Sequence, residues 1–507
     1  MATAEQKIAP SMSKSEMGQH LETGLASSGT DSGLDGLSVD HRDYLVEKHG
    51  TAELDPVPSF DDADPLNWPK HWKIINLILV AFHAMMATFT AAAIQSAFVN
   101  IAEDLEISVQ RASYLTSLVI AVLGGAPLIW RPLAHVYGRR PVFLVSLICS
   151  LVGNIGCAAS HSYATMAFCR ALTAFFIAPA IAIGSGVVTE IFFKRDRGLY
   201  MGIWATMVTL GVPIAPFIFG FVALRVGYRW IYYVLAIVNA VQFILYFFFG
   251  HESRYIPNNN LERKSSGFVG RYLNFRRIDP TPLSAVDFIR PLFLFARPCV
   301  IIPTAAYSMV FLWGSIMISI EIPQIFPESF GFNTQQVGLQ NIALIIGTVL
   351  GEQIGGRMSD AWMRLGNRSS NASRSRPEHR LWLSYIGFVL TLVGVVVFLV
   401  QLDHAVEKEE WNVTPLIGAA IAAAGNQIVT TVMITYAVDC YREEAASIGV
   451  FVTFVRQIWG FIGPFWFPEM IAELGFVKSI GVPIAMVVGV SVVPTIIVQC
   501  FGNRWRK

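Results

Sequence analysis

The feature that most constrains this chain is a series of apolar runs of about 20 residues, which begins near Ile74 and continues to about residue 501. A helix of about 20 residues is long enough to cross the ~30 Å hydrocarbon core of a bilayer. Hydrophobic residues make up 54% of the chain and charged residues only 14%, against roughly 25% charged residues in soluble domains. The pattern predicts an all-α polytopic membrane protein and excludes an ordinary soluble enzyme.

Twelve such runs are expected to form transmembrane helices, some of them interrupted by Gly and Pro, which membrane helices tolerate. The predicted spans are 74–98, 113–132, 141–159, 164–192, 199–223, 229–250, 299–325, 337–356, 381–401, 414–437, 445–468 and 481–501.

The distribution of Lys and Arg predicts the orientation of these spans. The loops and tail on one side hold 24 of these residues and the loops on the other side hold 5. Cytoplasmic loops carry the excess, so we expect both termini in the cytoplasm. Because no retention or vacuolar signal stands out, we expect a multi-pass protein of the plasma membrane. The whole chain carries 37 Lys and Arg against 36 Asp and Glu, which excludes nucleic-acid binding by net charge.

The predicted domains follow from these spans. Residues 1–70 are expected to form a disordered cytoplasmic tail, because a Ser-, Gly- and Asp-rich stretch there lacks helical periodicity. Residues 71–250 and 299–502 form two six-helix halves, 251–298 a cytoplasmic central loop, and 503–507 a short cytoplasmic tail. The loop end at 286–298 mixes aromatic residues with Arg; it either lies flat at the membrane surface or is a plain connector. Six plus six spans are typical of two-repeat transporters.

Between the second and third spans stands Arg131-Pro-Leu-Ala-His-Val-Tyr-Gly-Arg-Arg-Pro141. This loop resembles the signature loop of the major facilitator superfamily, with Gly138, Arg139 and Arg140 in matching positions. His135 stands where the family has Asp, and Arg131 where it has Gly. The resemblance implies a twelve-helix transporter fold and a cytoplasmic gate at this loop. The alternative is that the arginines serve only the orientation rule.

A gate of this kind needs an acidic partner for its cations. Since the family's Asp is absent, Glu190 near the inner end of the fourth span is the predicted partner. His135 is titratable and is expected to alter the pH response of the gate. The second half echoes the loop at Gly356-Arg-Met-Ser-Asp360, where Asp360 is present.

The fifth span contains Gly211-Val-Pro-Ile-Ala-Pro-Phe-Ile-Phe-Gly220. It resembles in part the antiporter motif of the same family, with Gly211, Pro216 and Gly220 matching, and so implies export. The alternative is a plain packing seam of small residues. Pro377-Glu-His-Arg-Leu381 and Tyr436-Ala-Val-Asp-Cys-Tyr441 are similar to stretches of fungal twelve-span drug:proton antiporters of the multidrug or secondary-metabolite efflux type. The resemblance extends over roughly residues 60–505.

Among the ionisable residues inside predicted spans, where an unpartnered charge is costly and is usually functional, four stand out. They are the candidates for transport and proton coupling: Arg170, Glu352, Arg456 and Glu321. Arg170 resembles the family's span-four arginine, which is linked to proton transfer. The alternative for Arg170 is a structural arginine bonded to backbone carbonyls. The alternative for each of the other three is an internally satisfied ion pair or a residue at the mouth, near water. A second set of side chains consists of candidates for the substrate cavity: Gln95, Trp313, Asn426, Gln427 and Gln457. Packing in the protein core is the alternative for Gln95 and Trp313.

Several chemistries are absent from the sequence. It has no phosphate-binding GxxxxGK[ST] loop, no HExxH and no GxSxG, so we expect no enzyme, no metal and no cofactor. The sequon Asn412-Val-Thr414 falls in a predicted outside loop and is a candidate for glycosylation, although Pro415 disfavours its use.

The sequence therefore predicts a secondary active transporter: a proton-coupled exporter, or antiporter, of small organic molecules such as drugs or fungal secondary metabolites. Its expected partners are a small-molecule substrate, protons and the lipid bilayer, and it is expected to be a monomer. The alternatives are a proton-coupled importer of polyamines, other cations or a small nutrient, and more remotely a transceptor or sensor.

Overall fold

The computed structural model describes residues 37–256, 277–369 and 377–506. Every regular element in these ranges is helical. Contacts divide the chain into two compact units, Met1–Asp61 and Asp62–Lys507, and each is described by itself.

The described part of the first unit contains one helix, α2 (Val39–His49). The sequence predicts no regular structure here, and that prediction is wrong for these eleven residues. Local capping is the physical reason. The side chain of Ser38 accepts a hydrogen bond from the backbone N–H of His41, and Gly50 ends the helix in the left-handed conformation. The first 36 residues of the predicted tail lie outside the described ranges.

In the described part of the second unit, twelve helices are long and apolar enough to cross a membrane. The predicted fold class and the number of spans are confirmed. The spans of the first half are α3 with η2 and α4 (Lys70–Ala92, Gln95–Ala97, Phe98–Asp104), α5 (Val109–Tyr137), α6 (Arg139–Ala158), α7 with α8 (Tyr163–Ile177, Pro179–Ile191), α9 (Lys194–Val226) and α10 (Arg229–Phe249).

The second half begins with α13, the π-helical η5 and α14 (Pro298–Phe311, Leu312–Met317, Ile318–Phe330), followed by α15 (Thr334–Ser369). It continues with η6 and α16 (Pro377–Leu381, Trp382–Glu407), α17 (Thr414–Cys440), and α18 with η8 (Ala445–Ile462, Gly463–Phe465). The connecting helix α19 (Phe467–Ser479) precedes the last span of α20, the π-helical η9 and α21 (Gly481–Met486, Val487–Val492, Val493–Trp505).

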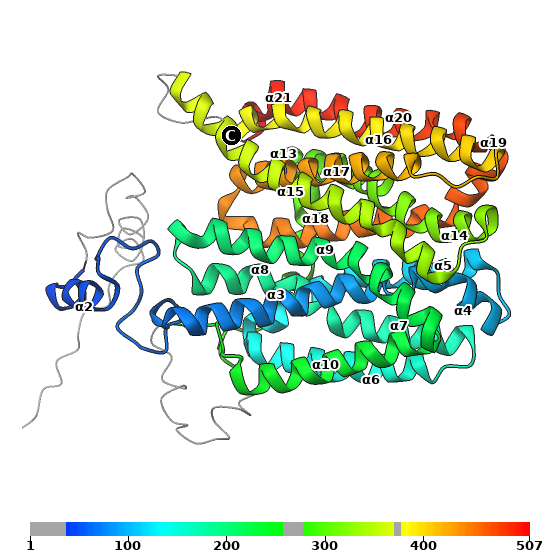
Figure 1. The fold of residues 1–507 in the computed structure, drawn as a ribbon. Coiled ribbons are helices and arrows are strands. Elements are labelled where there is room, and N and C mark those ends of the chain that lie inside the picture. Colours follow the sequence, from blue (N-terminus) through cyan, green and yellow to red (C-terminus); the bar gives the residue numbers. More distant parts are fainter. Residues whose placement is uncertain (1–36, 257–276, 370–376, 507) are drawn as a thin grey trace, which may run out of the picture. The chain divides into compact units, whose positions relative to one another are not determined.

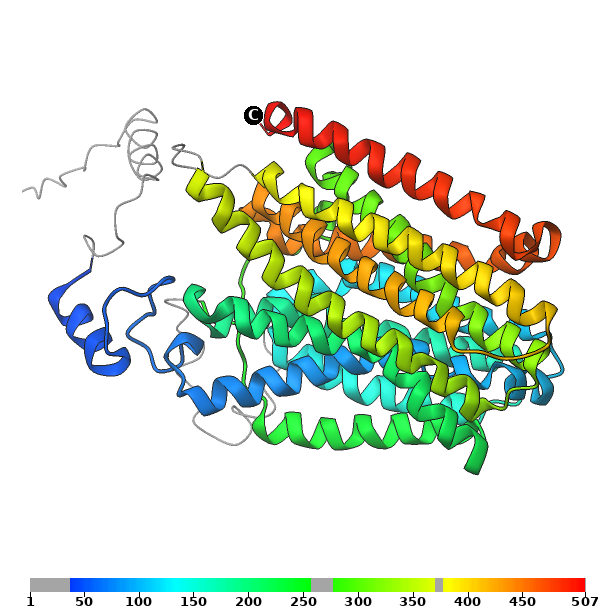
Figure 2. The same cartoon turned by 45° about the horizontal axis from the view of Figure 1, so that its top comes forward.

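Each half has its own buried apolar core. One core is built by residues of α3 to α10, and the other by residues from η4 (Arg290–Ala296) to α21 together with Ile120 of α5. Figures 1 and 2 show α6 and α10 on one outer side of the bundle and α16 and α21 on the opposite one. The start of α3 and the end of α21 lie at the same end of the bundle in both views.

Two seams join the halves. Along the first, Gly220 of α9 lies so close to α15 that a Cβ there would stand 2.7 Å from the carbonyl oxygen of Thr334 and 3.1 Å from the Cα of Gly338. Along the second, the side chain of Gln457 on α18 occupies the space beside Gly124 of α5. Small residues are what permit such close approach of membrane helices.

The end of the central loop forms α12 (Ala285–Ile289) and η4 (Arg290–Ala296). α12 starts with a capping box between Ser284 and Asp287. Large apolar side chains of this segment, Phe293 among them, are exposed. The segment contacts α5 on one side and α18 on the other, so it crosses the second seam between the halves.

Candidate functional site: a charged cluster and polar intramembrane residues

The arginine that begins α6 forms an ion pair with an acid of the fourth span. Arg139 opens α6, and its Nη2 lies 2.8 Å from Oε1 of Glu190 near the end of α8. Ser253, in the segment after α10, donates to Oε2 of the same carboxylate at 2.7 Å. The structure thus brings together the two residues that the sequence analysis paired.

A second carboxylate caps the start of α6. Glu252 accepts hydrogen bonds from the backbone N–H groups of Arg139 (2.8 Å) and Arg140 (2.9 Å), and from that of Arg254. Gly138 precedes the helix with φ of 94°, and a Cβ there would stand 2.5 Å from Oε2 of Glu252. Glycine is therefore required twice, for its conformation and for the approach of the cap. Burial raises the pKa of Glu252, against the lowering effect of the three N–H donors.

Arg140 contacts the end of a helix. Its Nε donates to the carbonyl of Gly250 and its Nη2 to that of Phe247, both at 2.8 Å. These carbonyls end α10, where a cation also complements the helix dipole. Together the two arginines join the start of α6 to the C-terminal ends of α8 and α10.

The central loop adds a strap to this cluster, here defined as residues 277–281. Its backbone N–H groups at Ile278 and Asp279 donate to the carbonyl of Val136 at 2.8 and 3.1 Å. Oδ2 of Asp279 lies 3.4 Å from Nδ1 of His135, whose Nε2 lies 2.7 Å from Arg254. This pattern assigns the ring proton of His135 to Nδ1.

Asp279 supplies a carboxylate beside the position where the family's signature loop has its own. Hydrogen bonds from the backbone and hydroxyl of Thr281 lower the pKa of Asp279, and the nearby His135 and Arg254 lower it further. The acid that the loop itself lacks is therefore provided by a residue more than 140 positions later in the chain.

Arg131 links the two halves. Its Nη1 lies 3.0 Å from the hydroxyl of Ser447 at the start of α18. The family has Gly at this position, so the contact comes from the departure of this chain from the family pattern. It joins α5 to the N-terminal end of α18.

The second half carries a corresponding cluster. Arg380 of η6 lies 3.4 Å from Asp439 at the end of α17 and donates to the hydroxyl of Ser359 at 2.6 Å. Glu378 of η6 lies 2.7 Å from Arg506. Asp360 is within α15, and its side chain lies outside the described part of the chain.

The three residues of the antiporter-like motif lie in α9 and face two neighbours. A Cβ on Gly211 would stand 2.6 Å from the carbonyl of Met85 in α3. Gly220 faces α15, and the carbonyl of Pro216 reaches Gly338 of the same helix. The motif thus packs α9 against one helix of its own half and one of the other half.

Glu352 and Gln427 are brought together. The side-chain amide of Gln427 on α17 donates to Oε2 of Glu352 on α15. Glu352 is half-buried, and no other hydrogen bond or ion pair involves it in the described ranges. At about 100° per residue, Glu352 points away from the exposed face of Ile346, Leu350 and Ile354. It is therefore turned from lipid toward the interior of the bundle.

Arg456 has a similar position on α18. At about 100° per residue it shares a face with Gly449 and Thr453, opposite the exposed Ile458 and Ile462. Its Nη1 donates to the hydroxyl of Tyr307 on α13 at 2.8 Å.

The guanidinium of Arg456 also lies 4.8 Å from the ring centre of Phe311. Its Nε is buried without a hydrogen-bond partner in the described chain. A cation held by aromatic groups alone keeps its charge available for a further partner.

Arg170 lies in a different environment. It is 2% exposed in α7. Its Nε donates to the carbonyl of Leu115 at 3.2 Å, and its Nη2 to those of Thr90 and Ala91 at 3.5 and 3.3 Å. These contacts correspond to the alternative in which backbone carbonyls hold the arginine. Among the described residues no carboxylate lies within 4.0 Å of it.

The remaining predicted side chains are buried but scattered. Glu321 of α14 and Gln95 of η2 each have a buried oxygen without a partner in the described ranges, as does Asn426 of α17. Trp313 of η5 packs edge-on to Trp466 with ring centres 5.5 Å apart. Gln457 packs against α5. In the part of the chain that the structure describes, the Glu352–Gln427 pair is the one hydrogen bond or ion pair that joins two members of the coupling and cavity sets.

Asn412 is exposed just before α17, and its Oδ1 accepts a hydrogen bond from the backbone N–H of Thr414 at 2.9 Å. In the described ranges, one group of side chains has the spacing of a metal site: Asp403, His404 and Glu407. The last two are exposed, and exposed groups of this kind need no ion.

Sequence reasoning missed Glu252, Ser253, Arg254 and Asp279. A signal for three of them was present: an acid and an arginine stand in His251-Glu-Ser-Arg254, directly after a long apolar span at the basic end. A charged pair at such a place is a candidate cap for a neighbouring helix. Asp279 carried no comparable signal.

Comparison with known proteins is consistent with this architecture. The model of the family described as Major Facilitator Superfamily matches residues 78–464. An efflux pump of Floropilus chiversii is 25% identical over 457 residues, covering 88% of this chain and 83% of the pump. An uncharacterized transporter of Schizosaccharomyces pombe is 26% identical, covering 87% of this chain and 92% of its own. An efflux pump of Gibberella moniliformis is 26% identical, covering 83% and 72%.

Proposed function

Because this chain belongs to the major facilitator superfamily, and is thus a membrane transporter rather than an enzyme, we propose that it is a proton-coupled exporter of small organic molecules. Drugs and fungal secondary metabolites are the proposed substrate class. Relatives named as efflux pumps and the antiporter-like motif of α9 support export. The proposal includes a plasma-membrane location, cytoplasmic termini and a monomeric protein whose two halves alternate access.

The observation that carries the proposal is the environment of Glu352. This carboxyl group is turned toward the interior of the bundle and is half-buried, and among the described residues it receives a hydrogen bond only from the neutral amide of Gln427. Acids inside membrane spans are the usual carriers of protons in pumps and transporters. A group with a neutral partner can gain and lose a proton without breaking an ion pair, so its charge can bias one state over the other.

Arg456 is the proposed counterpart of Glu352. It lies on the interior face of α18, about 16 Å from the helix start at 1.5 Å per residue, which is the depth where such transporters bind substrates. Its partners are a phenol hydroxyl and an aromatic ring. We propose that Arg456 attracts the proton-coupling acid or a polar group of the substrate.

The cluster at the basic end provides the proposed gate. Arg139, Glu190 and Glu252 keep the inner ends of α6, α8 and α10 together, while Arg131 reaches the other half. Rigid packing within one half, with Arg131 as a polar contact to the other half, suits rocking of two bodies.

The test uses vesicles containing the purified full chain and an imposed pH gradient. Uptake or extrusion of a panel of fluorescent organic compounds is measured for wild type and for Glu352→Gln. The wild type is expected to move at least one compound against its gradient only when the pH gradient is present. Glu352→Gln is expected to lose gradient-driven transport but to keep exchange of labelled for unlabelled compound, because exchange needs no net proton movement.

Glu328→Gln is the matched control, since Glu328 is exposed near the other end of the seventh span and has no partner among the described residues. It should transport like wild type. Gradient-driven transport by Glu352→Gln at the wild-type rate would contradict the assignment of the coupling acid. Transport that ignores the pH gradient in the wild type would contradict proton coupling altogether.

A further inference from the structure

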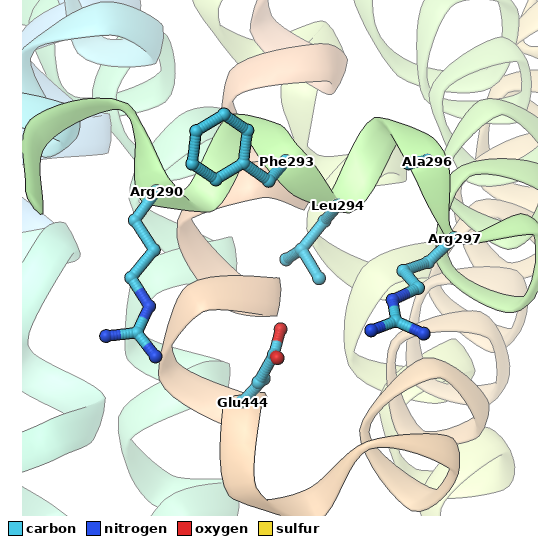
Figure 3. A pocket seen from close by; sticks show the side chains of 6 residues that line it. All are labelled: Arg290, Phe293, Leu294, Ala296, Arg297 and Glu444. Atoms are coloured by element: carbon cyan, nitrogen blue, oxygen red, sulfur yellow. The ribbon is translucent and has the colours of Figure 1, made fainter. Parts of the chain in front are cut away.

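A cleft of about 380 Å³ lies where the central loop meets the base of two spans. Figure 3 shows the six residues that line it. Five come from η4 and the start of α13, and one from η7 (Arg442–Glu444), the turn before α18. They are Arg290, Phe293, Leu294, Ala296, Arg297 and Glu444.

Three charged groups of this cleft have no ion pair. Neither Arg290 nor Arg297 has a carboxylate within 4.0 Å in the described chain, and Glu444 has no cation within that distance. Arg297 lies over the ring of Tyr441, 5.4 Å from its centre. Two guanidiniums and one carboxylate give the cleft a net charge of +1, with the acid set between the two cations (Figure 3).

The surroundings of the cleft are apolar and exposed. Phe293 is 60% exposed, Phe295 51% and Ile289 48%. Exposed aromatic residues beside arginines are typical of segments that lie at the membrane surface. The cleft is at the end of the bundle where the Lys and Arg excess lies, which is the end facing the anionic leaflet in the orientation rule.

We propose that this cleft binds the headgroup of phosphatidylserine. The headgroup carries a phosphate, a carboxylate and a primary ammonium, with one net negative charge. The two guanidiniums match its two anionic groups, and Glu444 matches its ammonium. The exposed side chains of η4 would contact the acyl chains at the bilayer surface.

The place of the cleft gives the lipid a regulatory role. α12 contacts α5 of the first half, and η4 contacts α18 of the second; Phe295 packs edge-on to Phe451 of α18 with ring centres 4.8 Å apart. A bound headgroup would fasten this segment across the seam that must open and close during alternating access. Phosphatidylserine is therefore expected to favour the state with this seam closed.

Native mass spectrometry of the purified full chain, with added phosphatidylserine, phosphatidylethanolamine, phosphatidylglycerol or phosphatidylcholine of equal acyl chains, tests the proposal. Phosphatidylserine should be retained best. Arg290→Gln and Arg297→Gln should each weaken its retention about tenfold, because each removes a charge-assisted hydrogen bond. Arg195→Gln, which removes an exposed arginine at the same end, is the control and should bind like wild type.

Glu444→Gln separates this proposal from a general basic patch. It should lower retention of phosphatidylserine to that of phosphatidylglycerol, which has no ammonium group, and leave phosphatidylglycerol unchanged. Equal retention of the two lipids by the wild type would overturn the proposal. Unchanged phosphatidylserine retention in the double variant Arg290→Gln/Arg297→Gln, with elution and melting like wild type, would overturn it as well. Both outcomes are independent of transport.

Discussion

Each half has an ion pair at the end of the bundle where the Lys and Arg excess lies, and the two ion pairs occupy corresponding positions. In the first half, an arginine at the start of the third span pairs with an acid at the end of the fourth: Arg139 with Glu190, at 2.8 Å. In the second half, an arginine at the start of the ninth span pairs with an acid at the end of the tenth: Arg380 with Asp439, at 3.4 Å. The repeat therefore preserves the position of the ion pair.

A second contact in each half places the acid on opposite helix ends. In the first half the acid, Glu252, follows the sixth span and meets backbone N–H groups of the third. In the second half the acid, Glu378, lies at the start of the ninth span, and the cation, Arg506, follows the twelfth. The ends of the third, fourth and sixth spans meet in the first half, and those of the ninth, tenth and twelfth meet in the second. The topology therefore determines which helix ends are in contact, while the sequence determines which residues make the contact.

A buried arginine also distinguishes the halves. Arg170 in the first half is held by three backbone carbonyls, whereas Arg456 in the second half has one phenol hydroxyl as its hydrogen-bond partner in the described chain. The guanidinium of Arg170 has its hydrogen-bond partners within the fold, whereas that of Arg456 has an N–H group free to bind a ligand in the described chain.

The largest expected effect tests this difference between arginines. Arg170→Gln removes a fully buried cation and strands carbonyls of α3 and α5, which should lower stability by about 4 kcal/mol. Arg456→Gln should change the melting temperature little and abolish transport. Thermal melting and vesicle transport of both variants give the comparison. A stable, inactive Arg170→Gln variant would instead place Arg170 in the coupling mechanism, as the family resemblance implies.

The two ion pairs at the basic ends are expected to differ in strength. Glu190→Gln leaves Arg139 buried without its carboxylate and should lower stability by about 3 kcal/mol. Asp439→Asn should lower it by about 1 kcal/mol, because the pair is longer and Arg380 keeps its contact with Ser359. Thermal melting of the two purified variants measures both. Equal losses of stability in the two variants would mean that neither the longer Arg380–Asp439 distance nor the Arg380–Ser359 hydrogen bond makes the second ion pair weaker than the first.

Much of the fold follows from the sequence because bilayer thickness sets the length of each apolar run. Each predicted span overlaps its helix, although helices such as α9 extend several residues beyond the apolar run. The Arg139–Glu190 contact was predictable because a motif named one partner and the orientation of the spans limited the other. The contacts of Glu252 and Asp279 were not, since each joins residues more than 100 positions apart and leaves no periodic pattern.

The helix α2 and the surroundings of Arg170 show the same limit on a smaller scale. A capped eleven-residue helix needs only Ser38 and Gly50 at its ends, and composition averaged over the tail conceals them. In the sequence, Arg170 looks like an unpartnered functional charge. Its partners are backbone carbonyls, and these leave no sign in the sequence because every residue has one. Backbone partners can be identified only from the packing of α3, α5 and α7.

The smallest expected effect concerns the pH response of the second contact in the first half. Burial raises the pKa of Glu252, so the native state binds this proton at a higher pH than the unfolded chain, whose Glu pKa is about 4.3. The contribution of this group to stability is fully present below that unfolded value and is lost as pH rises through the native one. Between pH 5 and 8, the melting temperature of the wild type should therefore fall more steeply than that of Glu252→Gln.

Glu328→Gln removes an exposed glutamate elsewhere and serves as the control for the pH series, with the slope of the wild type expected. Parallel slopes for wild type and Glu252→Gln would mean that the three N–H donors offset burial completely. The cap of α6 would then behave as an ordinary ionised helix cap. In that case the two halves would differ in which helix end carries the acid, but not in how the stability of this contact responds to pH.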